Sequence, residues 1–324
     1  MFENINSGKG LLTASALFRA AMRDNPTTGR IFLVGKDSLA RYNEYTAAYS
    51  TYADGVPVVY TTVKLAMAQC VASRGDVILV MQGHTETLSS ATAMLLNVAG
   101  VSIIGLGKGS LRPTITLGTA AATKIPVSAA NVTIKNCIFV ANFADIATCF
   151  LLTTAPEFVV DKCEFRDTSA ILNFLAIITT TVSVVADGSV FTNNKVALLG
   201  TTAATTPIKI LGTHNRLTIN DNYFVEAALN NTSAVLNHAA LVVTNLEMAR
   251  NRVFRPSTDT ATGALLIVTS STTNTGMVFD NKVFASDIAA ALLVTAGSIY
   301  GMFNNLYIGD ADASGYVLPA IGAN

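Results

Sequence analysis

Tryptophan is absent from this chain of 324 residues, cysteine occurs four times, and charged residues make up only 13%. Lys plus Arg (21) balance Asp plus Glu (21), so the formal net charge is zero. Binding to nucleic acid requires clustered basic residues that neutralise phosphates, and we therefore expect no nucleic-acid partner. Four cysteines in a chain of this length make no disulfide scaffold, and we interpret them as thiols of a protein made in a reducing bacterial cytoplasm.

Long uninterrupted hydrophobic runs are also missing, although 51% of the residues are hydrophobic and the mean hydropathy is +0.46. The most apolar stretches, Ala93–Leu106 and Ala170–Ala186, contain Asn97 and Asn173, and a membrane-spanning helix needs about 20 apolar residues in succession. We therefore expect no membrane partner. The first residues, Met-Phe-Glu-Asn, do not resemble a signal peptide. The apolar surplus is expected to be buried within the protein or between copies of it.

A short phrase recurs through the second half of the chain, as in VTIKNCIF, FVVDKCEF and LTINDNYF. Each copy ends in an aromatic residue and has a polar residue or glycine three positions earlier. The aromatic residues are Phe139, Phe165, Phe191, Phe224, Phe254, Phe284 and Tyr307. The residues three positions earlier are Asn136, Lys162, Gly188, Asp221, Asn251, Asn281 and Asn304. A strand-like run precedes each phrase, and repeats of this kind without helical spacing are typical of a parallel β-solenoid.

Aligning the copies on the aromatic residue predicts two interior columns. The phenylalanines of the first six copies are expected to form one of them. The other is expected to contain the residues five positions before the aromatic: Ile134, Val160, Ala186, Ile219, Ala249, Phe279 and Met302.

The segment before the repeats shows a different pattern. Thr61–Ser73 has apolar residues at helical spacing and precedes a buried strand, Val77–Met81. A helix here would cover the open end of the first coil. We expect four parts: an arm over 1–29, a cap with the first strands over 30–110, β-helix coils over 111–309 and a tail over 310–324.

The order of the cap helix, GDVILVMQG and VSIIGLGKG resembles the pectate-lyase-like superfamily of β-helices. More narrowly, it is similar to structural proteins of that fold from tailed bacteriophages. The resemblance is carried by Thr61–Asn142. It implies an all-β, single-stranded right-handed parallel β-helix with an N-terminal capping helix.

Residues that could carry chemistry are few. The aromatic alignment places Asp161 and Asp187 in one column, but neither has nearby basic residues in the sequence to complete a lyase site. The histidines His84, His214 and His238 are too far apart in coil number for a metal triad. We therefore predict no catalytic residues, no metal site and no cofactor, and expect that the protein is not an enzyme.

The function expected from the sequence is that of a structural virion protein, most specifically a decoration or cement protein on the outside of a phage capsid. Its partner would be the major capsid protein or another virion protein. The amphipathic arm would fix it there through Leu11, Phe18 and Met22. The alternative is a tailspike or fibre that binds or degrades host polysaccharide, and a third possibility is a free, secreted polysaccharide lyase.

The assembly expected is a homotrimer. The column six positions before the aromatic residue should face outward, and it carries no charge. It comprises Thr133, Val159, Val185, Thr218, Met248, Val278 and Gly301. We predict that Val159, Val185, Met248 and Val278 form the subunit interface.

Overall fold

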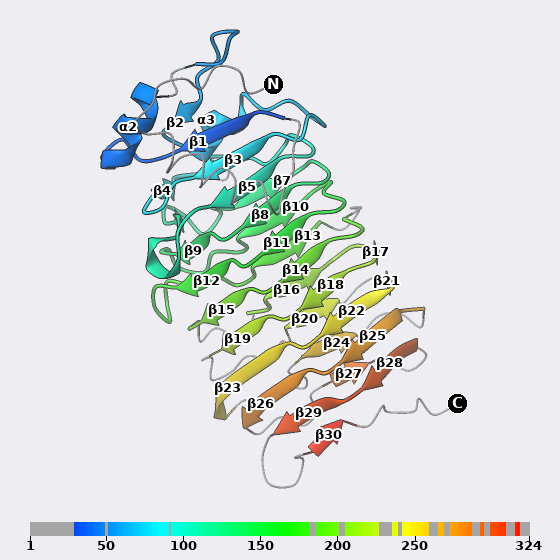
Figure 1. Cartoon of the computed structure of the whole chain (residues 1–324). Helices are drawn as coiled ribbons and strands as arrows, with labels where there is room; N and C mark the ends of the chain where they lie inside the picture. The colour runs from blue at the N-terminus through cyan, green and yellow to red at the C-terminus, as the bar shows by residue number, and fades with distance from the viewer. Residues whose placement is uncertain are drawn as a thin grey trace.

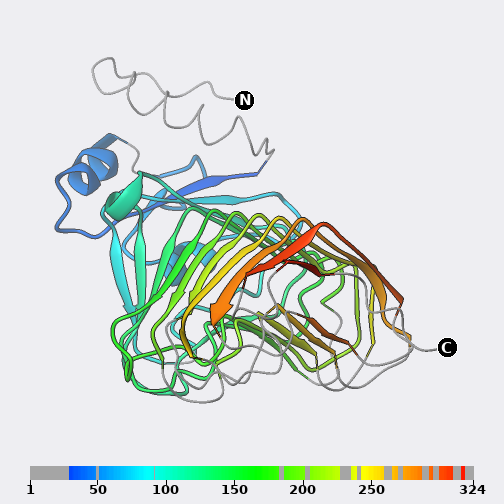
Figure 2. The same ribbon diagram turned by 90° about the horizontal axis from the view of Figure 1, so that it is seen from below.

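Most of the chain is a stack of coils built from short parallel strands. A computed structural model describes residues 29–48, 51–90, 92–181, 186–200, 205–226, 235–238, 242–258, 265–268, 273–286, 292–294, 299–308 and 315–317. Three long sheets run along the stack, and β1 and β30 lie at its two ends (Figure 1). Figure 2 views the stack from below, where successive coils overlap and surround the core.

The largest sheet, here called sheet I, has eleven described strands. They pair in parallel in the order β2-β1-β3-β5-β8-β11-β14-β18-β22-β25-β28. Their bounds are β1 Ile31–Val34, β2 Val59–Tyr60, β3 Val77–Val80, β5 Ser102–Gly105, β8 Thr133–Lys135, β11 Val159–Asp161, β14 Val190–Thr192, β18 Thr218–Asn220, β22 Leu246–Ala249, β25 Thr275–Phe279 and β28 Ile299–Phe303.

Sheet II has ten described strands. They are β4 Thr85–Leu88, β6 Thr114–Leu117, β9 Ile138–Ala141, β12 Glu164–Asp167, β15 Lys195–Leu198, β19 Tyr223–Glu226, β23 Arg252–Thr258, β26 Lys282–Ser286, β29 Asn305–Ile308 and β30 Gly315–Val317. All pair in parallel except β30, which runs antiparallel to β29.

Sheet III has seven described strands: β7 Ile125–Val127, β10 Phe150–Leu152, β13 Ile178–Thr180, β16 Ile208–Ile210, β20 Leu236–His238, β24 Leu266–Val268 and β27 Leu292–Val294. A small separate pair is formed by β17 His214–Asn215 and β21 Val243–Thr244. The chain passes through sheets III, I and II in turn, and this order repeats from β7–β8–β9 to β27–β28–β29. Parallel connections of this kind are almost always right-handed. The predicted fold class, a parallel β-helix, is confirmed.

Within the described residues the helices are few and short, and all lie near the first coils. They are α2 Ala40–Ala48, α3 Val63–Met67 and the 3-10 turn η1 Gly109–Leu111. Helix α3 is shorter than the expected helix over Thr61–Ser73, and Val71 is exposed beyond its end. Thr62 caps it by accepting a hydrogen bond from the Leu65 amide, and Val63, Ala66 and Met67 are buried against the core.

A left-handed residue turns the chain from sheet I to sheet II in every repeat. Its positive φ lies between 53° and 59° in all seven repeats, at Asn136, Lys162, Asn193, Asp221, Arg250, Asp280 and Asn304. The next residue turns its side chain inward: Cys137, Cys163, Asn194, Asn222, Asn251, Asn281 and Asn305 are all buried. Alternation along the following strand then decides which side chains are inside.

The five buried asparagines form a continuous hydrogen-bonded ladder, Asn194 to Asn305. Each backbone N–H from Asn194 to Asn281 donates to the side-chain oxygen of the asparagine in the next coil, at 2.9–3.2 Å. Each side-chain N–H₂ donates to a carbonyl of the preceding coil, as from Asn251 to Ile219 at 2.7 Å. The ladder satisfies buried polar groups at the corner and fixes the register of successive coils.

This corner also shows where the aromatic alignment is wrong. Phe139, Phe165 and Phe224 follow the left-handed residue by three positions and face inward, as predicted. Phe254 and Phe284 follow it by four positions, so they face outward; Phe254 is exposed and pairs with Phe284 in the neighbouring coil. The true interior residues of those two strands are Val253 and Val283.

Phe191 fills the interior aromatic stack from a different strand. It lies on β14 of sheet I and pairs with Val160 and Ile219, while Val196 occupies the equivalent place on sheet II. Its ring nevertheless lies between those of Phe165 and Phe224, with centroids 5.8 and 6.3 Å away. The rings of the first four phenylalanines therefore stack in the interior, but the prediction that all four share one strand column is wrong for Phe191.

Candidate functional site

The outer surface where sheet I turns into sheet II carries a cluster of charged side chains. Lys135 and Asp161 occupy paired positions on β8 and β11, and their side chains form an ion pair of 3.3 Å. Asn193, at the corner of the next coil, donates a side-chain hydrogen bond to Asp161 at 2.9 Å. The last residues of β8 and β11 therefore meet at the same edge of sheet I.

Glu164, on the other side of the corner, is surrounded by three cations. Arg166 Nε lies 3.6 Å from its carboxylate and Lys195 Nζ lies 3.9 Å away. Arg112 also pairs with it, reaching over from the loop that follows η1. The turn that leads into η1 needs glycine at position 107, where φ is +97° and an added Cβ would lie 2.8 Å from the Leu111 carbonyl oxygen.

The cluster as a whole is cationic. The side chains of Arg112, Lys135, Arg166 and Lys195 pair with the carboxylates of Asp161 and Glu164, which leaves a formal excess of two positive charges (four minus two). The side chain of Lys195 is 56% exposed and that of Arg166 is 41% exposed, so both can reach a ligand while they contact Glu164.

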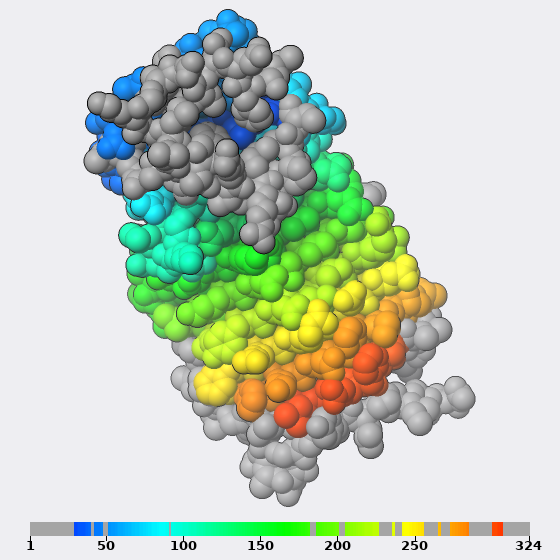
Figure 3. All heavy atoms as spheres, in the orientation of Figure 1, coloured from blue at the N-terminus to red at the C-terminus, as the bar shows by residue number. Residues whose placement is uncertain are grey.

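The same cationic character continues along the outer face of sheet II. The first outward column after the corner runs Glu164, Lys195, Tyr223, Arg252 and Lys282, each paired with the next in the adjacent coil. Tyr223 is 42% exposed, and no ion pair within the described part of the chain includes Arg252 or Lys282. In Figure 3 successive coils cross the surface as adjacent parallel bands, so such columns run along the stack.

A second outward column on sheet II is apolar where the first is basic. It contains Val225, Phe254 and Phe284 on β19, β23 and β26. Phe254 is 41% exposed. Guanidinium and ammonium groups pair with carboxylates, and exposed aromatic side chains offer apolar contact area, so the two columns together suit a long anionic ligand with apolar ring faces.

The predicted subunit-interface residues do not share one face. Val159 lies on the outward column of sheet I, paired with Thr133 and Val190. Met248 and Val278 are fully buried and pair with Ile219 and Met302 in the interior column, because their strands are offset by one residue from the aromatic alignment. The outward positions of those strands are Glu247 and Met277. Val185 lies outside the described residues.

Other predicted residues also need correction or lie elsewhere. Asp161 and Asp187 do not share a column: Asp161 pairs with Thr192, and Asp187 lies at the opposite corner, accepting a hydrogen bond from the Asn215 amide at 2.9 Å. Asp161 does have a basic neighbour, Lys135, which the sequence alone did not place there. The arm residues Leu11, Phe18 and Met22 lie outside the described residues.

Metal-ligating residues do not gather in the described part of the chain, where no group of three or more His, Cys, Asp and Glu side chains could hold an ion. The interior thiols are unreactive in character, since burial raises the pKa of Cys137 to about 12 and those of Cys149 and Cys163 well above the usual value. Among the described helices, none is long and apolar enough to cross a membrane.

Comparison with known proteins identifies similar folds only. No family model and no curated protein matches the chain. A rhamnogalacturonan lyase structure is similar over 90% of both chains, with 11% identity and a TM-score of 0.39. A pectate lyase from Bacillus sp. N165, in complex with trigalacturonate, is similar over 89% of this chain and 86% of its own, with 15% identity and a TM-score of 0.45.

The expectation that the protein is not an enzyme is corrected by these comparisons, since both similar structures are polysaccharide lyases. Part of its reasoning was also wrong, because Lys135 of the preceding coil pairs with Asp161, and Arg112 of the η1 loop pairs with the nearby Glu164. At this level of identity the similarity shows the parallel β-helix fold alone.

Proposed function

We propose that the protein binds an anionic polysaccharide along the outer face of sheet II. The observation that carries this proposal is the column Lys195, Tyr223, Arg252 and Lys282, flanked by Phe254. A polymer crossing the strands would meet one of these side chains in each coil, about 4.8 Å apart. Its carboxylates would pair with the cations, and its ring faces would contact Tyr223 and Phe254.

The test is a binding titration with polygalacturonate as the probe and its fully methyl-esterified form as the uncharged comparison. The double variant Arg252→Ala, Lys282→Ala should bind polygalacturonate at least about tenfold more weakly, a loss of about 1.4 kcal/mol. The matched control is Lys36→Ala, Lys209→Ala, which removes two exposed lysines elsewhere, Lys209 from sheet III, and should leave the affinity unchanged. Added salt should weaken binding to the acid form.

Several outcomes would reject the proposal. Equal losses in both double variants would show a non-specific charge effect, and equal affinity for the esterified polymer would remove the anionic requirement. Preferential binding of a single-stranded oligonucleotide would assign the face to nucleic acid. Absorbance of an unsaturated uronate in the same mixtures detects cleavage, which would extend the proposal from binding to lyase activity.

The finer role expected from the sequence, capsid decoration in a tailed phage, has no support in the fold or in the similar structures. Phage origin, virion location and a capsid partner therefore stay predictions. The polysaccharide role, which the sequence analysis carried as its alternative, takes first place because it follows from described side chains.

A further inference from the structure

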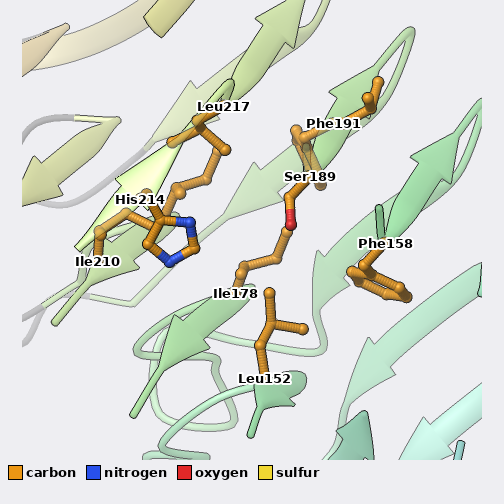
Figure 4. Close-up of a pocket in the computed structure, with 10 residues that line it drawn as sticks. Leu152, Phe158, Ile178, Ser189, Phe191, Ile210, His214 and Leu217 are labelled. Carbon is orange, nitrogen blue, oxygen red and sulfur yellow. The ribbon is translucent and has the colours of Figure 1, made fainter. Parts of the chain in front are cut away.

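His214 is a fully buried histidine at the corner between sheets III and I. It begins β17, where its amide donates to the Val242 carbonyl at 2.9 Å and its backbone pairs with Val243. Its imidazole faces the interior beside Ile210 and Leu217, in the same space that Ser189 and Ile178 face (Figure 4). A titratable side chain therefore lies among apolar ones.

Neither ring nitrogen of His214 makes a hydrogen bond of good geometry in the described part of the chain, although the Ala186 carbonyl lies near enough to favour the protonated ring. The nearby hydroxyl of Ser189 is already used, since it donates to the Ala186 carbonyl at 2.6 Å. A cavity of about 10 Å³ beside the ring leaves at most about enough room for one water molecule. The neutral imidazole has one N–H to satisfy, whereas the protonated form would have two N–H groups and a positive charge.

The charged groups around this corner offer His214 little compensation. Asp187, on the preceding coil, already accepts from the Asn215 amide, and Glu157 and Arg216 pair with each other across the exposed corner at 2.7 Å. Burial lowers the pKa of His214, and the Asp187 carboxylate and Ala186 carbonyl only partly offset this. The unfolded chain therefore takes up the proton more readily, and stability present above pH 6.5 falls as the pH is lowered.

We propose that His214 makes this corner acid-sensitive: when the imidazole takes a proton from solvent, residues 211–217 open and β17 separates from β21 while the remaining coils stay folded. The ladder from Asn194 to Asn305 contains no titratable group, so its hydrogen bonds at the corner between sheets I and II do not depend on pH in this way. The device is independent of the proposed polysaccharide site, which lies on sheet II.

Hydrogen exchange measured by NMR or mass spectrometry tests this directly. The amides of His214 and Arg216, which donate to Val242 and Thr244, should lose protection about tenfold or more between pH 7.5 and pH 5.0, after correction for intrinsic exchange rates. The Asn222 amide, which donates within the ladder at 3.1 Å, serves as the internal control and should keep its protection.

Two variants separate His214 from other titrating groups. His214→Gln should abolish the acid-dependent loss, whereas His84→Gln should retain it, because His84 is equally buried but has Glu86 3.4 Å from its ring. Asp167 titrates in the same range with the opposite effect on stability, and comparison between variants cancels its contribution.

If His214→Gln does not fold, the imidazole of the native protein still decides the question. Its ¹³C–¹H resonance should remain in the neutral position down to the pH at which protection is lost. A His214 resonance that titrates at about 6.5 in a protein with unchanged protection at this corner would overturn the proposal. So would equal acid sensitivity in His214→Gln.

Discussion

Asn251 illustrates how much one side chain holds in the corner ladder. It accepts hydrogen bonds from the amide and side chain of Asn222, and it donates to the Ile219 carbonyl and to Asn281. All of these groups are buried, so loss of the amide leaves several of them without partners.

Replacing Asn251 by leucine should therefore lower the free energy of unfolding by about 2–4 kcal/mol, since each buried group left unpaired costs about 1–3 kcal/mol. Unfolding in guanidinium chloride measures this change in the free energy of unfolding. Arg252→Ala, one residue later with an exposed side chain, is the control and should change stability by about 0.5 kcal/mol or less. Equal values for both variants would show that the ladder contributes no net stability.

Asp167 predicts a pH effect of the opposite sign to that of His214. Burial raises the pKa of its carboxyl to about 6, although the amides of Phe174, Leu199 and Gly200 donate to it and favour the charged form. The folded protein therefore holds this proton more tightly than the unfolded chain, and the stability it confers is lost as the pH rises through about 6.

Unfolding experiments at pH 4.5 and pH 7.0 test this in the His214→Gln background. Wild-type Asp167 should gain roughly 2 kcal/mol relative to Asp167→Asn on going to the lower pH, since one pKa unit corresponds to about 1.4 kcal/mol. A difference between the two proteins that does not change with pH would contradict the raised pKa.

The sequence predicted the positions of the bends better than it predicted which strand residues face the core. Asparagine and aspartate tolerate the left-handed conformation, and the aligned residues Asn136, Asp221 and Asn304 do occupy the bend. Asn251 and Asn281, from the same alignment, are instead the buried residues one position after it. Phenylalanine fits either face of a pleated strand, and as a register marker it placed Met248 and Val278 outside when they are inside. A buried asparagine has stricter requirements, and aligning Asn194, Asn222, Asn251, Asn281 and Asn305 gives the register without error.

At the scale of single strands, glycine is required at one position of β25. Gly276 has φ of +154°, and an added Cβ would lie 2.3 Å from the Leu246 carbonyl oxygen in the preceding coil. Gly301 occupies β28 of the next coil, where an added Cβ would meet nothing closer than 3.8 Å. A side chain at position 276 would therefore clash with the preceding coil, whereas position 301 has room for one.

Gly276→Ala should destabilise the protein by about 2–4 kcal/mol, because the backbone of two coils must move apart. Gly301→Ala should be close to neutral in the same thermal or denaturant unfolding experiment. Similar effects of both substitutions would mean that β25 adjusts its backbone without penalty.

The charged cluster around Glu164 could not be predicted from the sequence, because a loop brings together residues that are far apart in the chain. Arg112 and Glu164 are 52 residues apart and meet because the η1 loop reaches down across the coils. Strand periodicity predicts which face a residue takes, but the path of a loop depends on local turns such as that at Gly107. The column on sheet II was within reach, since Lys195, Tyr223, Arg252 and Lys282 each follow a ladder asparagine.

For the whole molecule, the predicted homotrimer remains to be measured. The outward column of sheet I is uncharged over Thr133, Val159, Val190 and Thr218, but Glu247 interrupts it in the following coil. Light scattering of the purified chain gives the mass directly. If this shorter strip joins three copies, Val159→Lys with Val190→Lys should yield monomers with unchanged circular dichroism, whereas a monomeric wild type would reject the trimer.

The asparagine ladder also makes the junctions between successive coils equivalent to one another. Every asparagine offers the following and preceding coils the same pair of groups, so the bonding at one junction does not depend on its position in the stack. Consider a duplicate of residues 222–250 inserted after Arg250. The side-chain oxygen of its Asn222 would accept the hydrogen bond from the asparagine of the coil before, and its backbone N–H would donate to Asn251 of the coil after. The protein could therefore be lengthened by whole coils, because the ladder hydrogen bonds would fix the register of each added coil.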